Sequence, residues 1–161
     1  MIGPDSGKEN VMANAQGQLV STLNHLIEVG KDGELSCMTG AREVHNPEIR
    51  AILTGTAETC RASVLELKAL VSALGAEPRD RGSMGGSLHR GWMEVLHMIA
   101  PHNDDAVLQL CERDEETARR EYQSALTKEM PADVRAVVQR QYEGIQWHHD
   151  RIHAMRGMQI H

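Results

Sequence analysis

The sequence has almost no aromatic residues. They make up 2% of the 161 residues, and phenylalanine is missing altogether. Strands in sandwiches and barrels depend on aromatic and β-branched side chains, so this shortage argues against a strand-rich fold. The chain also lacks any apolar run near the roughly 20 residues that a bilayer-spanning helix needs. We therefore expect an all-α protein with no membrane association and a core of aliphatic residues and methionine.

Cysteines are few, and acidic residues outnumber basic ones. The three cysteines, at positions 37, 60 and 111, are an odd number without paired spacing, which is typical of free thiols in a reducing cytoplasm. The formal net charge of −6 opposes nucleic-acid binding through bulk charge. The first 18 residues lack the basic-then-apolar order of a secretion signal. These features predict a cytoplasmic protein with no nucleic-acid partner.

Apolar residues recur at three- and four-residue spacing along four long segments, which predicts four amphipathic helices. Asn46 before a proline marks the start of the second long helix, and Gly75 marks its end. Asn103, followed by two acidic residues, marks the start of the third. Pro131 separates the last two helices. The first two helices and the last two are therefore each joined by a short link.

The connection in the middle of the chain is much longer than the other two. It can travel the length of the bundle and carries a shorter helical pattern over residues 87–99. The second and third long helices can then run parallel, which is the single-crossover topology of ferritin-like four-helix bundles. Trp92 in this crossover either packs on the bundle or contacts a partner. We expect a flexible leader over 1–18, the bundle over 19–156 and a tail over 157–161.

Acidic residues and one histidine interrupt the apolar stripes near the middle of the predicted bundle. Two-metal sites in such bundles use a Glu from each of two helices and a Glu-x-x-His from each of the other two. Glu34 and Glu115 match the single-Glu positions. Glu58 and His149 match one member each of the paired motifs. These four residues are the candidate ligands for iron or manganese, which carboxylate and imidazole donors suit.

Two substitutions in the paired motifs favour a different interpretation. Arg61 stands where a ligand histidine is expected, and Gln146 stands where a glutamate is expected. Arg61 could instead form a buried or half-buried salt-bridge layer with Glu34, Glu58 and Glu115. In that case no cofactor is expected, and we favour this interpretation.

The remaining metal-capable residues also have structural explanations. His149 and His153 lie one helical turn apart, a spacing that binds zinc, copper or nickel weakly, but a solvated face near a helix C-terminus is the favoured explanation. The three cysteines lie on apolar stripes of three different helices, where we expect them to be small buried hydrophobic residues.

Several short motifs resemble a bacterial family of ferritin-like four-helix-bundle proteins catalogued as domain of unknown function 2383. The motifs are Leu26-Ile27, Lys31-Asp32-Gly33, Glu66-Leu67, Leu74-Gly75, Leu88-His89-Arg90-Gly91-Trp92, Cys111-Glu112-Arg113-Asp114-Glu115, Tyr122, Gln141-Tyr142 and His149-Asp150-Arg151-Ile152. The resemblance spans about residues 19–156 and implies the ferritin-like fold. Its wider superfamily includes iron-storage proteins and di-iron oxidases, which is the reason to consider metal.

We expect a non-catalytic, soluble helical bundle that is stress-associated and self-associates into a homo-oligomer. The alternative is a metalloprotein that binds iron or manganese through Glu34, Glu58, Glu115 and His149 for oxidation or storage. A third hypothesis is a partner-binding module that uses the crossover helix and Trp92. The favoured hypothesis does not make the chain an enzyme.

Overall fold

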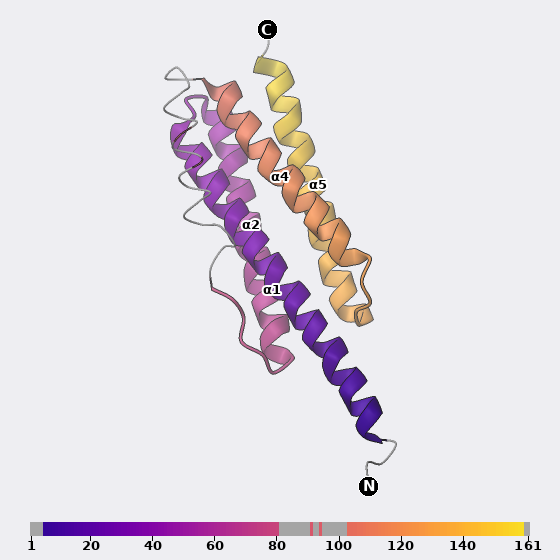
Figure 1. Cartoon of the computed structure of the whole chain (residues 1–161). Coiled ribbons are helices and arrows are strands. Elements are labelled where there is room, and N and C mark those ends of the chain that lie inside the picture. The colour runs from indigo at the N-terminus through magenta and orange to yellow at the C-terminus, as the bar shows by residue number, and fades with distance from the viewer. Residues whose placement is uncertain (1–4, 81–90, 92–93, 95–102, 160–161) are drawn as a thin grey trace.

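Four long helices lie side by side in the computed structural model, which describes residues 5–80, 91, 94 and 103–159 (Figure 1). They are α1 (Asp5–Glu43), α2 (Pro47–Ala73), α4 (Asp104–Leu126) and α5 (Ala132–Gln159). The described residues contain no strand, so the predicted all-α bundle is confirmed. The expected crossover helix and Trp92 lie outside the described residues, apart from Gly91 and Glu94. No helix in the described ranges has the length and apolar character needed to cross a membrane.

The helix boundaries around α2 and α4 follow the capping signals in the sequence. The side-chain oxygen of Asn46 accepts hydrogen bonds from the backbone N–H groups of Glu48 (2.8 Å) and Ile49 (3.4 Å). Asn103 caps α4 in the same way. Gly75 has φ +78, a left-handed conformation that glycine adopts without strain, directly after the residue that caps α2.

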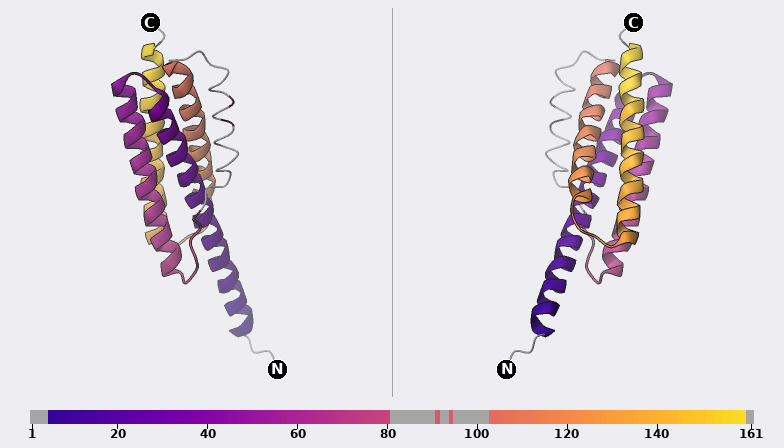
Figure 2. Two further views of the ribbon diagram at one scale, coloured as in Figure 1. Left: turned by 90° about the vertical axis from the view of Figure 1, so that its left-hand side faces the viewer. Right: turned by 90° about the vertical axis from the view of Figure 1, so that its right-hand side faces the viewer.

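The start of α4 lies against the start of α2. Both carboxylate oxygens of Asp104 accept hydrogen bonds, from the backbone N–H groups of His45 and Asn46, at 2.9 Å each. The two helices therefore begin at the same end of the bundle and run parallel, while α1 and α5 run the other way (Figures 1 and 2). This arrangement is the single-crossover topology expected from the long middle connection.

α1 begins earlier than the apolar pattern indicates. The sequence places its start near Leu19, but the helix already begins at Asp5. Residues 7–18 are exposed, and the first turns of α1 extend past the ends of the other helices (Figure 2). Because these turns bury no apolar face, they carry no periodic pattern that could reveal them. The limits of the folded domain itself stay a prediction.

The apolar core is divided into two clusters, one toward each end of the bundle. The first joins the Leu19–Ile27 stretch of α1 to the end of α2, the end of α4 and the start of α5. The second joins the end of α1 to the start of α2, the start of α4 and the end of α5. Between them lies a middle layer that contains Cys60 and Glu115, which belong to neither cluster, and Tyr122 of the first cluster borders it.

Candidate functional site

A cavity of about 200 Å³ lies in this middle layer, and all four helices contribute to its wall. Most of the surface that lines it is apolar, with a small number of polar groups. Ligand sites of helix bundles are built in the bundle core from side chains on facing helices. The lining residues with the greatest bearing on its shape and chemistry are Gly33, Cys60, Glu115, Tyr122, Gln141 and His148.

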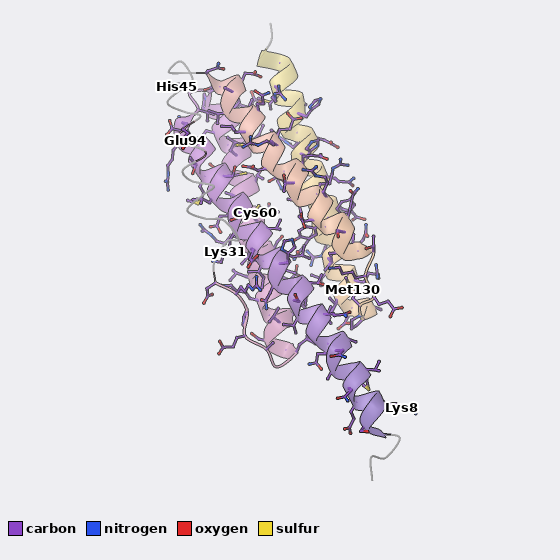
Figure 3. All side chains as sticks on the ribbon, viewed as in Figure 1. Lys8, Lys31, His45, Cys60, Glu94 and Met130 are labelled. Atoms are coloured by element: carbon purple, nitrogen blue, oxygen red, sulfur yellow. The ribbon has the colours of Figure 1, made fainter. Side chains whose placement is uncertain are left out.

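The cavity exists because small or polar residues occupy core-facing positions at mid-bundle. On α1 these positions hold Gly30 and Gly33, and on α2 they hold Cys60 and Ser63. Figure 3 shows Cys60 about half-way along the helices. A Cβ atom at Gly33 would lie 3.2 Å from the Cys60 Sγ atom. Large aliphatic residues at these positions would close the space that the cavity occupies.

Glu115 is the charged group at the centre of this layer. Its side chain is almost completely buried, with 2% of the residue exposed, and the Cys37 thiol donates a hydrogen bond to its Oε1 atom at 3.9 Å. Among the described residues, no lysine, arginine or histidine forms an ion pair with it. Burial raises the pKa of Glu115 to about 7, and the neighbouring charge of Asp114 acts in the same direction.

Tyr122 and Gln141 form a polar bridge at one side of the cavity. The Tyr122 hydroxyl donates a hydrogen bond to Gln141 Oε1 at 2.8 Å. Gln141 Nε2 in turn donates to Glu66 Oε1 at 2.8 Å and to the backbone oxygen of Ser63 at 3.3 Å. Burial raises the pKa of Tyr122, so its hydroxyl stays protonated and acts as a donor. The bridge therefore ties α5 to α2 and α4.

His148 forms a second bridge between α5 and α2. Its Nδ1 atom lies 3.0 Å from Thr56 Oγ1, and its Nε2 atom lies 3.2 Å from Thr59 Oγ1. Burial and the nearby charge of Arg151 lower the pKa of His148, which favours the neutral imidazole. α2 and α5 make the fewest contacts of the adjacent helix pairs. These two bridges are therefore important links between them, and Gly144 lies between the bridges on α5.

The structure places the four predicted metal ligands in different surroundings. Glu34 accepts a hydrogen bond from Arg61 Nε at 2.8 Å, on the surface, and Glu58 is exposed. Glu115 lines the cavity, and His149 lies at the contact of α4 and α5. The favoured salt-bridge layer forms only in part, because Arg61 pairs with Glu34 but not with Glu58 or Glu115 among the described residues. Arg61 is 59% exposed and projects outward, while Glu115 projects inward.

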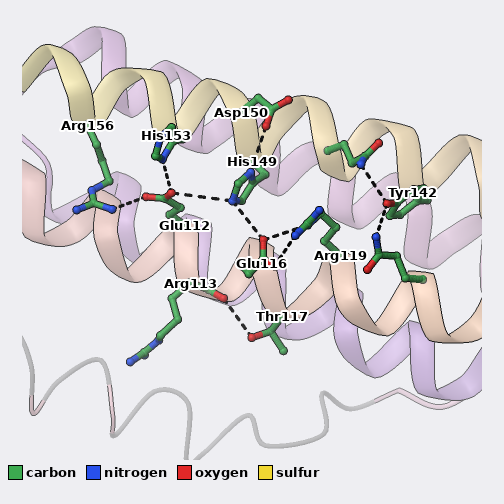
Figure 4. Close-up of polar contacts among 12 residues, drawn as sticks. Glu112, Arg113, Glu116, Thr117, Arg119, Tyr142, His149, Asp150, His153 and Arg156 are labelled. Carbon is green, nitrogen blue, oxygen red and sulfur yellow. Dashed lines mark hydrogen bonds and ion pairs between the residues drawn. The ribbon is translucent and has the colours of Figure 1, made fainter.

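His149 belongs to a charged network along α4 and α5 (Figure 4). Its Nε2 atom lies 3.4 Å from Glu116 Oε2, and the His153 Nδ1 atom lies 2.5 Å from Glu112 Oε1. Arg156 donates to the other oxygen of Glu112 at 2.6 Å. Although burial opposes the effect, hydrogen bonds from Arg156 and His153 lower the pKa of Glu112. The two histidines thus contact carboxylates of α4. The His153 side chain is 69% exposed, as expected for a solvated face, whereas the His149 side chain is 20% exposed.

The placement of these carboxylates and histidines determines whether they can serve as ligands for iron or manganese. The carboxylates near His149 already accept hydrogen bonds from arginines, and the middle layer holds one buried carboxylate, Glu115. Within the described ranges, no group of three or more His, Cys, Asp or Glu side chains could hold a metal ion. As placed, these residues do not supply the donor set of a two-metal centre. The four-ligand site stays a prediction for metal analysis to test.

The three cysteines are free, and two of them are fully buried. A hydrogen bond with Cys111, together with burial, raises the pKa of Cys37 well above its ordinary value. Burial and the nearby Glu115 do the same for Cys60. Both thiols therefore stay protonated near neutral pH, which makes them poor nucleophiles.

Our sequence interpretation missed Gln141 and His148 as site residues. The signal was present, because both continue the three- and four-residue spacing of the apolar stripe Val134, Val138, Ile145, Ile152. Thr56, Cys60 and Ser63 interrupt the stripe of α2 in the same way. A search restricted to acidic residues and histidine motifs overlooks neutral polar groups at core positions.

A family model described as "Domain of unknown function (DUF2383)" matches residues 18–128. The chain belongs to this family. The matched range contains most of α1, all of α2 and all of α4, and ends before α5. Gln141 and His148, on the α5 side of the cavity, therefore lie C-terminal to the part of this DUF2383 protein that the family model matches.

Solved structures with the same fold include two distant neighbours. One is a two-domain protein with DJ-1/ThiJ/PfpI-like and ferritin-like domains from Anabaena variabilis. It has 11% identity and a TM-score of 0.72, and the alignment covers 90% of this chain and 37% of that one. The other is a mutant of Mycobacterium smegmatis Dps1, with 10% identity, a TM-score of 0.72 and coverage of 89% and 97%. No curated protein matches the sequence. The expected ferritin-like fold of the DUF2383 protein is thus confirmed.

Proposed function

We propose that the chain is a non-catalytic ferritin-like bundle that binds a small molecule in its mid-bundle cavity. The observation that carries this proposal is the cavity of about 200 Å³ between the two apolar clusters. An apolar protein cavity of roughly 150 Å³ is large enough to bind benzene. The cavity therefore has room for a ligand with a single ring or a short aliphatic body.

The chemistry of the wall supports binding rather than catalysis. The thiol of Cys60 in the wall has a raised pKa and stays protonated. His148 is held between two threonine hydroxyls and has a lowered pKa, so it is not arranged as a base that activates a nucleophile. The polar groups of the wall instead form bridges that hold α2 and α5 around the space.

Gly144 offers a direct way to fill the cavity. It lines the space, and a Cβ atom placed on it meets no atom within 4 Å. A leucine there can extend into the cavity without a backbone clash. Gly157, on the same helix and also without a neighbour within 4 Å, lies away from the cavity and provides the matched control.

The experiment follows binding of benzyl alcohol by two-dimensional NMR of the full chain. We expect saturable shifts at cavity-lining residues in the wild type and in Gly157→Leu, and a loss of these shifts in Gly144→Leu. Identical shifts in Gly144→Leu, or none in the wild type, would overturn the proposal.

The metal alternative is tested on the same material. Metal analysis of untagged protein that yields two iron or manganese ions per chain would favour a metalloprotein and overturn a purely small-molecule site. Self-association, a role in stress and a cytoplasmic location stay predictions. Size-exclusion chromatography with light scattering tests the first of them.

A further inference from the structure

The charges around the cavity are unbalanced, and this imbalance bears on the class of ligand. Glu115 places a carboxyl group in the wall. The other polar groups of the wall, apart from Arg140, are neutral: hydroxyl groups, a thiol, the Gln141 amide and the His148 imidazole. Arg140 is 62% exposed and donates a hydrogen bond to Glu66 Oε2, so its charge is already compensated outside the space.

A buried carboxylate is costly unless a cation or several donors compensate its charge. The hydrogen-bond donor to Glu115 is the Cys37 thiol at 3.9 Å, and a thiol is a weak donor. No described cationic side chain reaches it. A ligand that carries one positive charge would provide the missing partner, whereas a ligand carboxylate or phosphate would be repelled.

The lining of the remaining space determines the chemical character of the rest of the ligand. The lining is mainly apolar, with Val29, Ile145 and the Tyr122 ring among the contacts. A cation with several charged groups would leave some of them without partners. A single ammonium group on a compact apolar body meets both requirements at once, because each part faces a wall of matching character.

We propose that the cavity binds a small primary amine, with the ammonium group on Glu115 and the apolar body between α1, α4 and α5. This inference rests on the proposed small-molecule function and specifies its ligand class. Glu115 then provides specificity, and the two bridges between α2 and α5 enclose the bound molecule.

The test compares benzylamine with benzyl alcohol, which have the same ring and differ in the charged group. In the wild type at about pH 8, where benzylamine is protonated and most of Glu115 is ionised, we expect benzylamine to bind at least about tenfold more tightly. Binding is measured from NMR shifts of cavity-lining residues, so that loose association of a cation with the acidic surface is not counted. This comparison needs no variant.

Variants then locate the preference. Glu115→Gln keeps the shape and removes the charge, so it should reduce benzylamine binding about tenfold while benzyl alcohol binding is retained. Glu34→Gln makes the same change at a glutamate outside the cavity and should keep the wild-type preference. Equal affinities in the wild type, or a preference that survives in Glu115→Gln, would overturn the amine assignment. Binding of benzyl alcohol with no amine preference would leave the small-molecule function intact, whereas failure of both probes would refute it as well.

Discussion

Replacing Glu115 with glutamine should change how the stability of the bundle depends on pH. In the folded chain the pKa of Glu115 is about 7, against an ordinary value of 4.5. Between these two pH values the folded state holds a proton that the unfolded state has lost. Because the folded state then binds more protons, the free energy of unfolding falls as pH rises through this window. The loss is complete by about pH 8, one unit above the pKa of the folded chain.

The size of this effect follows from the two pKa values. A pKa that rises from 4.5 to about 7 corresponds to about 3 kcal/mol of unfolding free energy. The wild type should therefore lose about 3 kcal/mol through this group between about pH 4.5 and about pH 8. Glutamine is neutral throughout, so the Glu115→Gln variant lacks this contribution. It should gain about 3 kcal/mol relative to the wild type across the same range.

Urea unfolding of both proteins over this pH range measures the difference. Groups such as Glu112 and Glu116, whose pKa values are lowered, titrate in both proteins and cancel in the comparison. Glu34→Gln retains the carboxyl group at position 115 and should follow the wild-type profile. Parallel profiles for the wild type and Glu115→Gln would refute our account of Glu115 as a buried carboxyl group without a cationic partner.

Three further predictions concern the packing, a helix cap and a buried hydrogen bond, and urea unfolding measures each of them. Gly30→Ala places a Cβ atom 2.6 Å from a valine methyl carbon of α2 and should lower the free energy of unfolding by about 1–3 kcal/mol. Gly17→Ala, at an exposed helical position, should raise it by about 0.5–1 kcal/mol. Equal effects of the two substitutions would exclude the close contact between α1 and α2. Asn46→Ala removes the cap of α2 and should cost about 1 kcal/mol, so an unchanged midpoint would contradict the capping role. Tyr122→Phe leaves the Gln141 oxygen without its donor and should cost about 1–3 kcal/mol, a loss that Gln141→Leu in the same chain should partly recover.

The sequence predicted the helices well wherever they bury an apolar face. Asn46, Gly75 and Asn103 gave the boundaries because capping residues act locally, through the backbone groups next to them. The first turns of α1 were missed because a helix exposed on all sides needs no periodic pattern. Parallel α2 and α4 followed from the length of the middle connection alone.

The candidate site was predicted less completely, because spacing places a residue on a face without fixing the direction of its side chain. Glu34 and Glu115 both interrupt apolar stripes, yet Glu34 reaches the surface and Arg61, while Glu115 stays inside. A long, flexible arginine can leave a core for solvent, which the spacing of its backbone does not reveal. The cavity itself arises from several small residues on different helices, and one-dimensional patterns do not show that they meet.

Because the core is divided into two clusters, the residues that hold the helices together are different from those that line most of the cavity. Each end holds its share of the four helices together with large aliphatic side chains. The waist between them contributes less to that cohesion. Residues of this middle layer can therefore change in size and charge, and so alter which ligand the cavity binds. The two apolar clusters would still hold the four helices in the same arrangement.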